Sequence, residues 1–72
     1  MEAMRKRVQQ AFDDAEVIKV IFQYPAAVRA TIKTGRVLEV FDDGFTLDDV
    51  IDGEATYSYK FVVEIRGERE SG

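Results

Sequence analysis

The sequence predicts a mainly β domain with one N-terminal helix and five strongly bent antiparallel strands that close into a small barrel. Short runs rich in β-branched and aromatic residues fill the chain from Val17 to Ile65, and tight-turn signals separate them at Asp42-Asp43-Gly44 and Asp52-Gly53. One long run passes through Gly35, where the missing Cβ allows a sharp bend. A strand that bends and folds straight back is typical of a very small barrel.

The first predicted element is a helix over about residues 2–12. Its apolar positions recur at three- and four-residue spacing, at Met1, Met4, Val8 and Ala11 or Phe12. The charges oppose the helix dipole, since Arg5-Lys6-Arg7 lies near the N-terminus and Asp13-Asp14 near the C-terminus. We therefore expect this helix to dock on one end of the barrel, which covers about residues 16–66 and precedes a polar tail, residues 67–72, that is expected to fray.

Two strands are predicted next. The segment from Val17 to Tyr24 is β-branched or aromatic with few breaks, and Pro25 ends it because proline cannot donate to a ladder. Its expected inward face consists of Ile18, Val20, Phe22 and Tyr24. From Val28 to Lys33, apolar and polar residues alternate, as in a half-buried strand. This second strand is expected to continue through the bend as far as Phe41.

The remaining strands are predicted around two turns. Asp42-Asp43-Gly44 suits a type I turn with a glycine bulge, after which Phe45 and Leu47 both point inward. The last run, from Ala55 to Ile65, is long for one straight strand, so we expect a bend near Lys60-Phe61 to divide it. Its alternation places Tyr57, Tyr59, Phe61, Val63 and Ile65 on one side, and Ser58, Lys60, Val62 and Glu64 on the other.

Composition excludes several classes of function. The chain has 72 residues, enough for one domain, and contains neither cysteine nor histidine. It therefore lacks thiolate ligands, the usual general base and the usual zinc ligand, so we expect no enzyme, no metal site and no cofactor. The absence of disulfides fits a cytoplasmic location, and no signal peptide or membrane partner is expected.

Acidic residues crowd the second half of the chain, at Asp42, Asp43, Asp48, Asp49, Asp52 and Glu54. Several converging carboxylates can hold calcium, but a helix-flanked calcium loop needs them at alternate positions with a central glycine and a closing glutamate. These acids instead occur in pairs at turns. We interpret them as solvated turn residues that also protect a sheet edge from aggregation.

Two groups of residues are candidates for binding. Lys33 and Arg36, at the bend, and Lys60, on the last strand, could hold phosphate groups beside the tyrosines, although a solvated polar face is the alternative interpretation. The net charge of -4 makes a general affinity for phosphate backbones unfavourable. On the strands' other faces, Val17, Ile21 and Val62 are apolar residues that could contact a partner subunit.

Two motifs give the chain a loose family resemblance. The run from Gly35 to Asp42 is similar to the signature of Sm-like proteins, which include the bacterial Hfq-type RNA chaperone, with one residue more before Phe41. Ile65-Arg66-Gly67 matches the second Sm signature in letters. The segments Gly44 to Leu47 and Tyr57 to Phe61 resemble the corresponding parts of WYL domains, without their Trp and Tyr.

The resemblance implies a small bacterial-type barrel that senses or binds nucleic acid or another ligand. We therefore expect a non-enzymatic Sm-like or WYL-like binding module that forms a homo-oligomer by pairing strand edges, with RNA, DNA or a nucleotide as its ligand. The alternative is a protein-protein interaction or assembly module that binds no nucleic acid.

Overall fold

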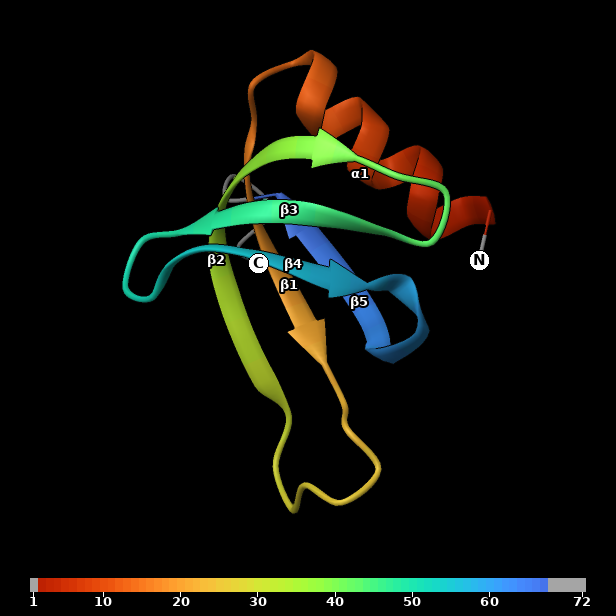
Figure 1. Cartoon of the computed structure of the whole chain (residues 1–72), viewed down its shortest axis with the longest axis vertical. Helices are drawn as coiled ribbons and strands as arrows, with labels where there is room; N and C mark the ends of the chain where they lie inside the picture. The colour runs from red at the N-terminus through yellow and green to blue at the C-terminus, as the bar shows by residue number, and fades with distance from the viewer. Residues whose placement is uncertain (1, 68–72) are drawn as a thin grey trace.

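The computed structural model describes residues 2–67, which form one helix and one antiparallel sheet of five strands (Figure 1). The elements are α1 (Glu2–Asp13), β1 (Val17–Phe22), β2 (Thr31–Val40), β3 (Gly44–Asp49), β4 (Gly53–Ser58), the 3-10 turn η1 (Tyr59–Phe61) and β5 (Val62–Gly67). The mainly β fold class with one N-terminal helix is thereby confirmed. The predicted tail lies outside the described residues except for Gly67, which belongs to β5 and is buried.

The helix α1 lies across one end of the sheet, as its apolar spacing predicted (Figure 1). Val8 and Ala11 are fully buried. The chain reverses direction after the helix at Ala15. The φ of Ala15 is 51°, in the left-handed region that glycine usually occupies at the end of a helix. Arg7 fixes this corner through a bidentate pair with Glu16, at 3.0 and 2.9 Å.

Strand β1 crosses the core. Ile18, Val20 and Phe22 are fully buried on its inward face, as predicted. The turn at Pro25 is also confirmed, because the Ala27 N–H donates to the carbonyl of Tyr24 at 3.0 Å.

The prediction that β2 begins at Val28 is wrong. The strand begins at Thr31, and Val28 and Ile32 are 99% and 61% exposed. The end of β1, the connecting loop and the start of β2, residues 21–33, form an arm that projects beyond the rest of the domain (Figure 1). Alternation buries one face only where another layer covers it, and the loop at the end of the arm lies outside the core.

Gly35 lies where β2 turns through a wide curve and meets β3 (Figure 1). A Cβ on this residue would lie 1.9 Å from the carbonyl oxygen of Asp48, so glycine is required by the close approach of the neighbouring backbone. Further along β2, the register with β3 shifts between Val37 and Glu39. Leu38 is the extra residue, and such bulges increase the local bend.

The hairpin between β2 and β3 differs from its prediction. Gly44 does not have the positive φ of a glycine bulge; among the described glycines only Gly53, in the β3–β4 turn, has one, at 81°. Gly44 instead allows close approach, because its Cβ would lie 2.2 Å from the Tyr57 carbonyl oxygen. Phe45 and Leu47 follow it and are fully buried, as predicted.

The strand order is β4-β3-β2-β1-β5, so β4 and β5 are the two edges of an open sheet. The predicted closure into a barrel is not present in the hydrogen-bonded ladders of the described residues. The sheet is nevertheless curled, because Tyr57 of β4 and Phe22 of β1 have ring centroids 4.9 Å apart although two strands, β3 and β2, separate β4 from β1 in the sheet. The aromatic residues between them form the middle of the core.

The predicted break in the last strand is confirmed by η1, but the faces expected directly beyond it are reversed at Val62 and Val63, whereas Ile65 packs against the core, on its predicted side. Val62 is only 8% exposed and lies in the core, whereas Val63 is 55% exposed. A 3-10 turn advances the chain by three residues a turn instead of alternating it, so the phase of the strand changes across η1. The pairing of β5 with β1 also shifts beside Phe22, which leaves Val63 without a register partner.

Candidate functional site

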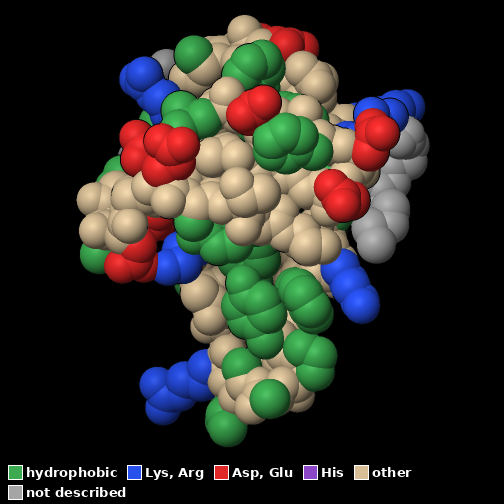
Figure 2. All heavy atoms as spheres, viewed as in Figure 1, with side chains coloured by type: hydrophobic (Ala, Val, Ile, Leu, Met, Phe, Trp, Pro, Cys, Tyr) green, Lys and Arg blue, Asp and Glu red, His purple; other side chains and the backbone are tan. Residues whose placement is uncertain are grey.

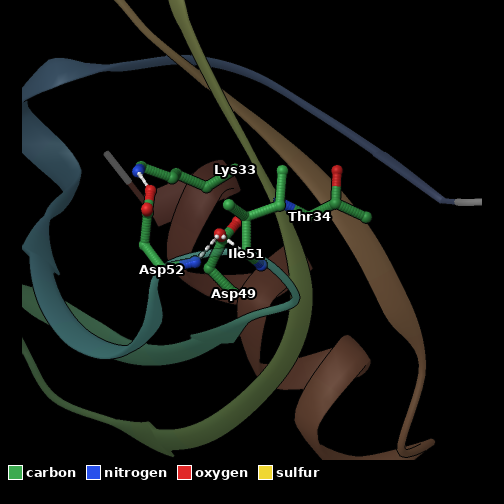
Figure 3. A network of polar contacts seen from close by, with 5 residues as sticks. All are labelled: Lys33, Thr34, Asp49, Ile51 and Asp52. Carbon is green, nitrogen blue, oxygen red and sulfur yellow. Dashed lines mark hydrogen bonds and ion pairs between the residues drawn. The ribbon is translucent and has the colours of Figure 1, made fainter.

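Lys33 and Asp52 form an ion pair that joins the arm to the β3–β4 turn (Figure 3). Lys33 comes from β2, and its side chain is 19% exposed. The hydrogen bond to Asp52 raises the pKa of the Lys33 ammonium above its usual 10.5. This lysine thus already has an anionic partner within the chain.

Asp49, at the end of β3, holds the same corner together (Figure 3). Its carboxylate accepts the backbone N–H groups of Thr34 at 2.8 Å, Ile51 at 3.0 Å and Asp52 at 2.7 Å. These bonds, the one from Asp52 foremost, lower the pKa of Asp49 below 3.8. The residue is 5% exposed, so its hydrogen bonds make up for its burial.

The structure does not bring Lys33 and Arg36 together. Three positions apart on β2, they point to opposite faces of the sheet, because successive side chains alternate. Arg36 is exposed and lies directly across from Asp48 in the β2–β3 register. Each of the two predicted cations therefore has an acid of β3 or the β3–β4 turn beside it, which reduces the attraction for phosphate.

Lys60 lies elsewhere, on η1, at the entrance to β5. Its Nζ is 5.8 Å from the centroid of the Phe61 ring, within the range of a cation–π contact. The Phe61 ring is in turn 5.1 Å from that of Tyr24, at the base of the arm. Both rings are half-buried. A predicted cation thus lies beside a pair of half-buried aromatic rings at this place.

The other two tyrosines pack in or against the core. Tyr59 is 3% exposed and donates a hydrogen bond to the Phe41 carbonyl at 3.2 Å. Tyr57 is half-buried between Phe22 and Phe45. Burial raises the pKa of both phenols above 10. Both rings pack against other aromatic rings of the core.

The three residues predicted to contact a partner lie in different environments. Val17 and Ile21 are half-buried on β1 and face away from the core, across from Arg36 and Ile32. Val62 is instead buried in the core of the chain. Val63 and Ile32 are the exposed apolar residues near Val17 and Ile21. The apolar surface on the outer side of β1 therefore includes more residues than predicted, with Ile32 and Val63 in place of Val62.

Within residues 2–67 the acids do not converge: no three of them lie close enough to hold a metal ion. Asp42, Asp43 and Asp52 lie in the connections between strands, and Asp48 and Glu54 are exposed residues of β3 and β4 that flank the β3–β4 turn. Asp49 differs from the interpretation as a solvated turn residue, because it is buried at the end of β3. The signal for its role was local, since an Asp directly before a turn often accepts the N–H groups of residues two and three positions further on. The single described helix is too short and too polar to cross a membrane.

Comparison of the chain with protein-family models, with curated proteins and with solved structures finds no match.

Proposed function

We propose that this chain is a non-enzymatic, Sm-like small β module that assembles with copies of itself by pairing the two free edges of its sheet. The observation that carries this proposal is that β4 and β5 each have a strand neighbour on one side only. Unpaired edges expose a row of N–H and C=O groups that readily pair with another chain. A curled sheet with a docked helix is also what an Sm-like barrel would require.

The charges on the two edges are complementary. At the β4 edge, Glu54 of β4 lies directly across from Asp48 of β3, and both are exposed acids. Beside β5, Arg66 lies directly across from Lys19 on β1. Like charges opposite one another weaken a sheet within one chain, and an oppositely charged edge of a second chain would relieve both pairs. Glu64 accepts from Arg66 and reduces, without cancelling, the positive charge of this edge.

Pairing β4 of one copy with β5 of the next is a heterologous contact, because it uses two different surfaces. Such contacts generate closed rings or open filaments. A 72-residue domain also gains stability from association, since its own core is small.

Native mass spectrometry at low salt tests the proposal. We expect wild type to be oligomeric and Glu54→Lys to lower the mass of the assembly, because lysine on the β4 edge would then meet Arg66 on the β5 edge of the next copy. Glu39→Lys is the matched control, because Glu39 is an exposed acid on the inner strand β2 and makes the same change of charge. A monomeric wild type, or equal masses for Glu54→Lys and Glu39→Lys, would reject edge pairing.

A second candidate is binding of RNA, DNA or a nucleotide, which the contact between Lys60 and the Phe61 ring favours. The cation would hold a phosphate while a base stacks on the half-buried aromatic pair of Phe61 and Tyr24. This candidate uses Lys60 and leaves Lys33 and Arg36 as minor contributors.

Fluorescence anisotropy with labelled single-stranded RNA and DNA at two salt concentrations tests the second candidate. Lys60→Glu should remove salt-sensitive binding, and Lys6→Glu, an exposed lysine on α1, should retain it. The pair Lys33→Glu with Arg36→Glu should have the smaller effect. Equal binding by wild type and Lys60→Glu would exclude this site.

A further inference from the structure

The arm leaves one edge of β2 unpaired at the start of the strand. Strand β1 pairs with β2 along residues 31–36, but β3 pairs with it only from Gly35 onward. The Thr34 carbonyl still accepts the Val50 N–H, at 2.9 Å, on the β3 side. Alternate residues of a strand direct their N–H and C=O groups to the same side, so those of Ile32 point past the end of β3. Among residues 2–67, no strand lies there in Figure 1.

Exposed aliphatic side chains lie on the arm and on the β3–β4 turn, which is hydrogen-bonded to β2 next to this open edge. Ile32 is 61% exposed on the strand itself, Val28 is 99% exposed on the loop, and the β3–β4 turn adds Val50 at 73% and Ile51 at 86%. Figure 2 shows hydrophobic side chains gathered over the arm, while most acidic side chains lie over the body of the domain. Single exposed aliphatic residues are ordinary, but four of them beside one open strand edge are an interaction surface.

The two parts of this surface, the loop at the end of the arm and the β3–β4 turn, carry opposite charges. The sequence has no acid from residue 17 to residue 38, and Arg29, next to Val28, is the exposed cation of the loop. The β3–β4 turn carries Asp52, whose side chain is 60% exposed although it pairs with Lys33. A basic apolar loop and an acidic apolar turn on one chain are complementary to the same two parts of a second copy.

We propose that two copies of this chain pair through the open edge of β2, antiparallel, about a two-fold axis at Ile32. The two Ile32 residues would exchange N–H···O bonds and place their side chains next to each other. Val28 and Arg29 of each copy would then reach the turn at Val50–Asp52 of the other. The contact is isologous, so it closes at two copies.

This inference rests on the proposed function only in that both involve self-assembly, because it uses a different edge. The dimer about β2 leaves β4 and β5 free. Variants at Glu54 therefore test the heterologous contact, and variants on the arm test the two-fold contact. Loss of either contact with retention of the other identifies which proposal has failed.

Disulfide trapping gives the sharpest test, because the chain has no cysteine of its own. Ile32→Cys places the two thiols across the axis, where opposed Cα atoms about 5.5 Å apart are within range of a disulfide. The matched control is Leu38→Cys, a 42% exposed aliphatic residue on the same strand away from the arm. We expect Ile32→Cys to cross-link on the order of tenfold faster or more under mild oxidation, because the dimer raises the effective thiol concentration.

Arg29→Glu provides a second, non-covalent measurement. We expect it to shift the monomer–dimer equilibrium toward monomer in sedimentation velocity, and Leu38→Asp to leave it unchanged. Equal cross-linking of Ile32→Cys and Leu38→Cys would overturn the proposal. A monomeric wild type that cosediments with phosphatidylserine vesicles would also overturn the proposal if Arg29→Glu abolished that cosedimentation. The arm would then bind lipid instead of a second copy.

Discussion

Replacing Gly35 with alanine should remove a large part of the stability of this domain. The added Cβ would lie 1.9 Å from the Asp48 carbonyl oxygen and 2.6 Å from its carbon. Carbon and oxygen in weak contact normally stay about 3.3 Å apart, so β3 must move away by roughly 1 Å or more. Both neighbouring atoms belong to the backbone, so no side chain can rotate aside to make room.

This displacement acts on the hydrogen bonds next to Gly35. The Val50 N–H to Thr34 carbonyl bond is 2.9 Å long, and the Thr34 N–H to Asp49 bond is 2.8 Å long. Losing two or three such bonds, with their partners left unsatisfied, should cost about 3–5 kcal/mol. The free energy of unfolding of a 72-residue domain is about 4–11 kcal/mol, so Gly35→Ala should be marginally folded.

Gly53→Ala is the matched control. Gly53 has a φ of 81°, but no atom lies within 4 Å of the Cβ that alanine would add. Its left-handed conformation costs about 1–2 kcal/mol, offset by about 0.4–1 kcal/mol from a less flexible unfolded chain. Thermal unfolding followed by circular dichroism should show a midpoint lowered by roughly 12–40 °C for Gly35→Ala and far less for Gly53→Ala. Equal shifts would refute the argument that close backbone approach requires glycine at position 35.

Three further substitutions test other parts of the structure. Val62→Asp should unfold the domain because it places a carboxylate in the core, whereas Val63→Asp at the exposed neighbour should leave urea unfolding nearly unchanged; similar effects would contradict the phase change across η1. Asp49→Asn should lower stability at pH 7. Because the folded pKa of Asp49 is depressed, its contribution is present above about pH 3.8 and is lost as the pH falls further, so the variant should show a flatter acid-side unfolding profile. Tyr59→Phe removes the hydrogen bond to Phe41 and should cost about 1 kcal/mol in urea titrations, and an unchanged midpoint would argue against that bond.

Local patterns were sufficient to predict the elements and several inward faces. The helical spacing of Val8 and Ala11 placed both residues in the core. The alternation in β1 and β3 identified fully buried residues such as Ile18 and Phe45, and the bend at Lys60 was expected from the length of the last run. These features depend on neighbours within a few residues in the chain, which is the range that a pattern can report.

The candidate site was less predictable, because its charges are compensated by distant residues. Asp52 lies 19 positions from Lys33, and Asp49 lies 15 positions from Thr34. No local spacing indicates that a turn aspartate will be buried against another strand. Lys33 and Arg36, which are close together in the sequence, therefore lie on two different faces of the sheet, each beside an acid.

The sequence alone determined the order of helix and strands and the sites of the turns, since each follows from the chemistry of neighbouring residues. The reason that position 35 must be glycine came from the tertiary structure, because the atoms that a Cβ would meet belong to Asp48 on the neighbouring strand. Only the tertiary structure decided which apolar residues are covered. Val28 and Ile32 alternate as well as any residues in the core, yet they are exposed because the arm extends beyond the sheet. Burial depends on what lies above a face, and that is fixed by packing between segments far apart in the chain.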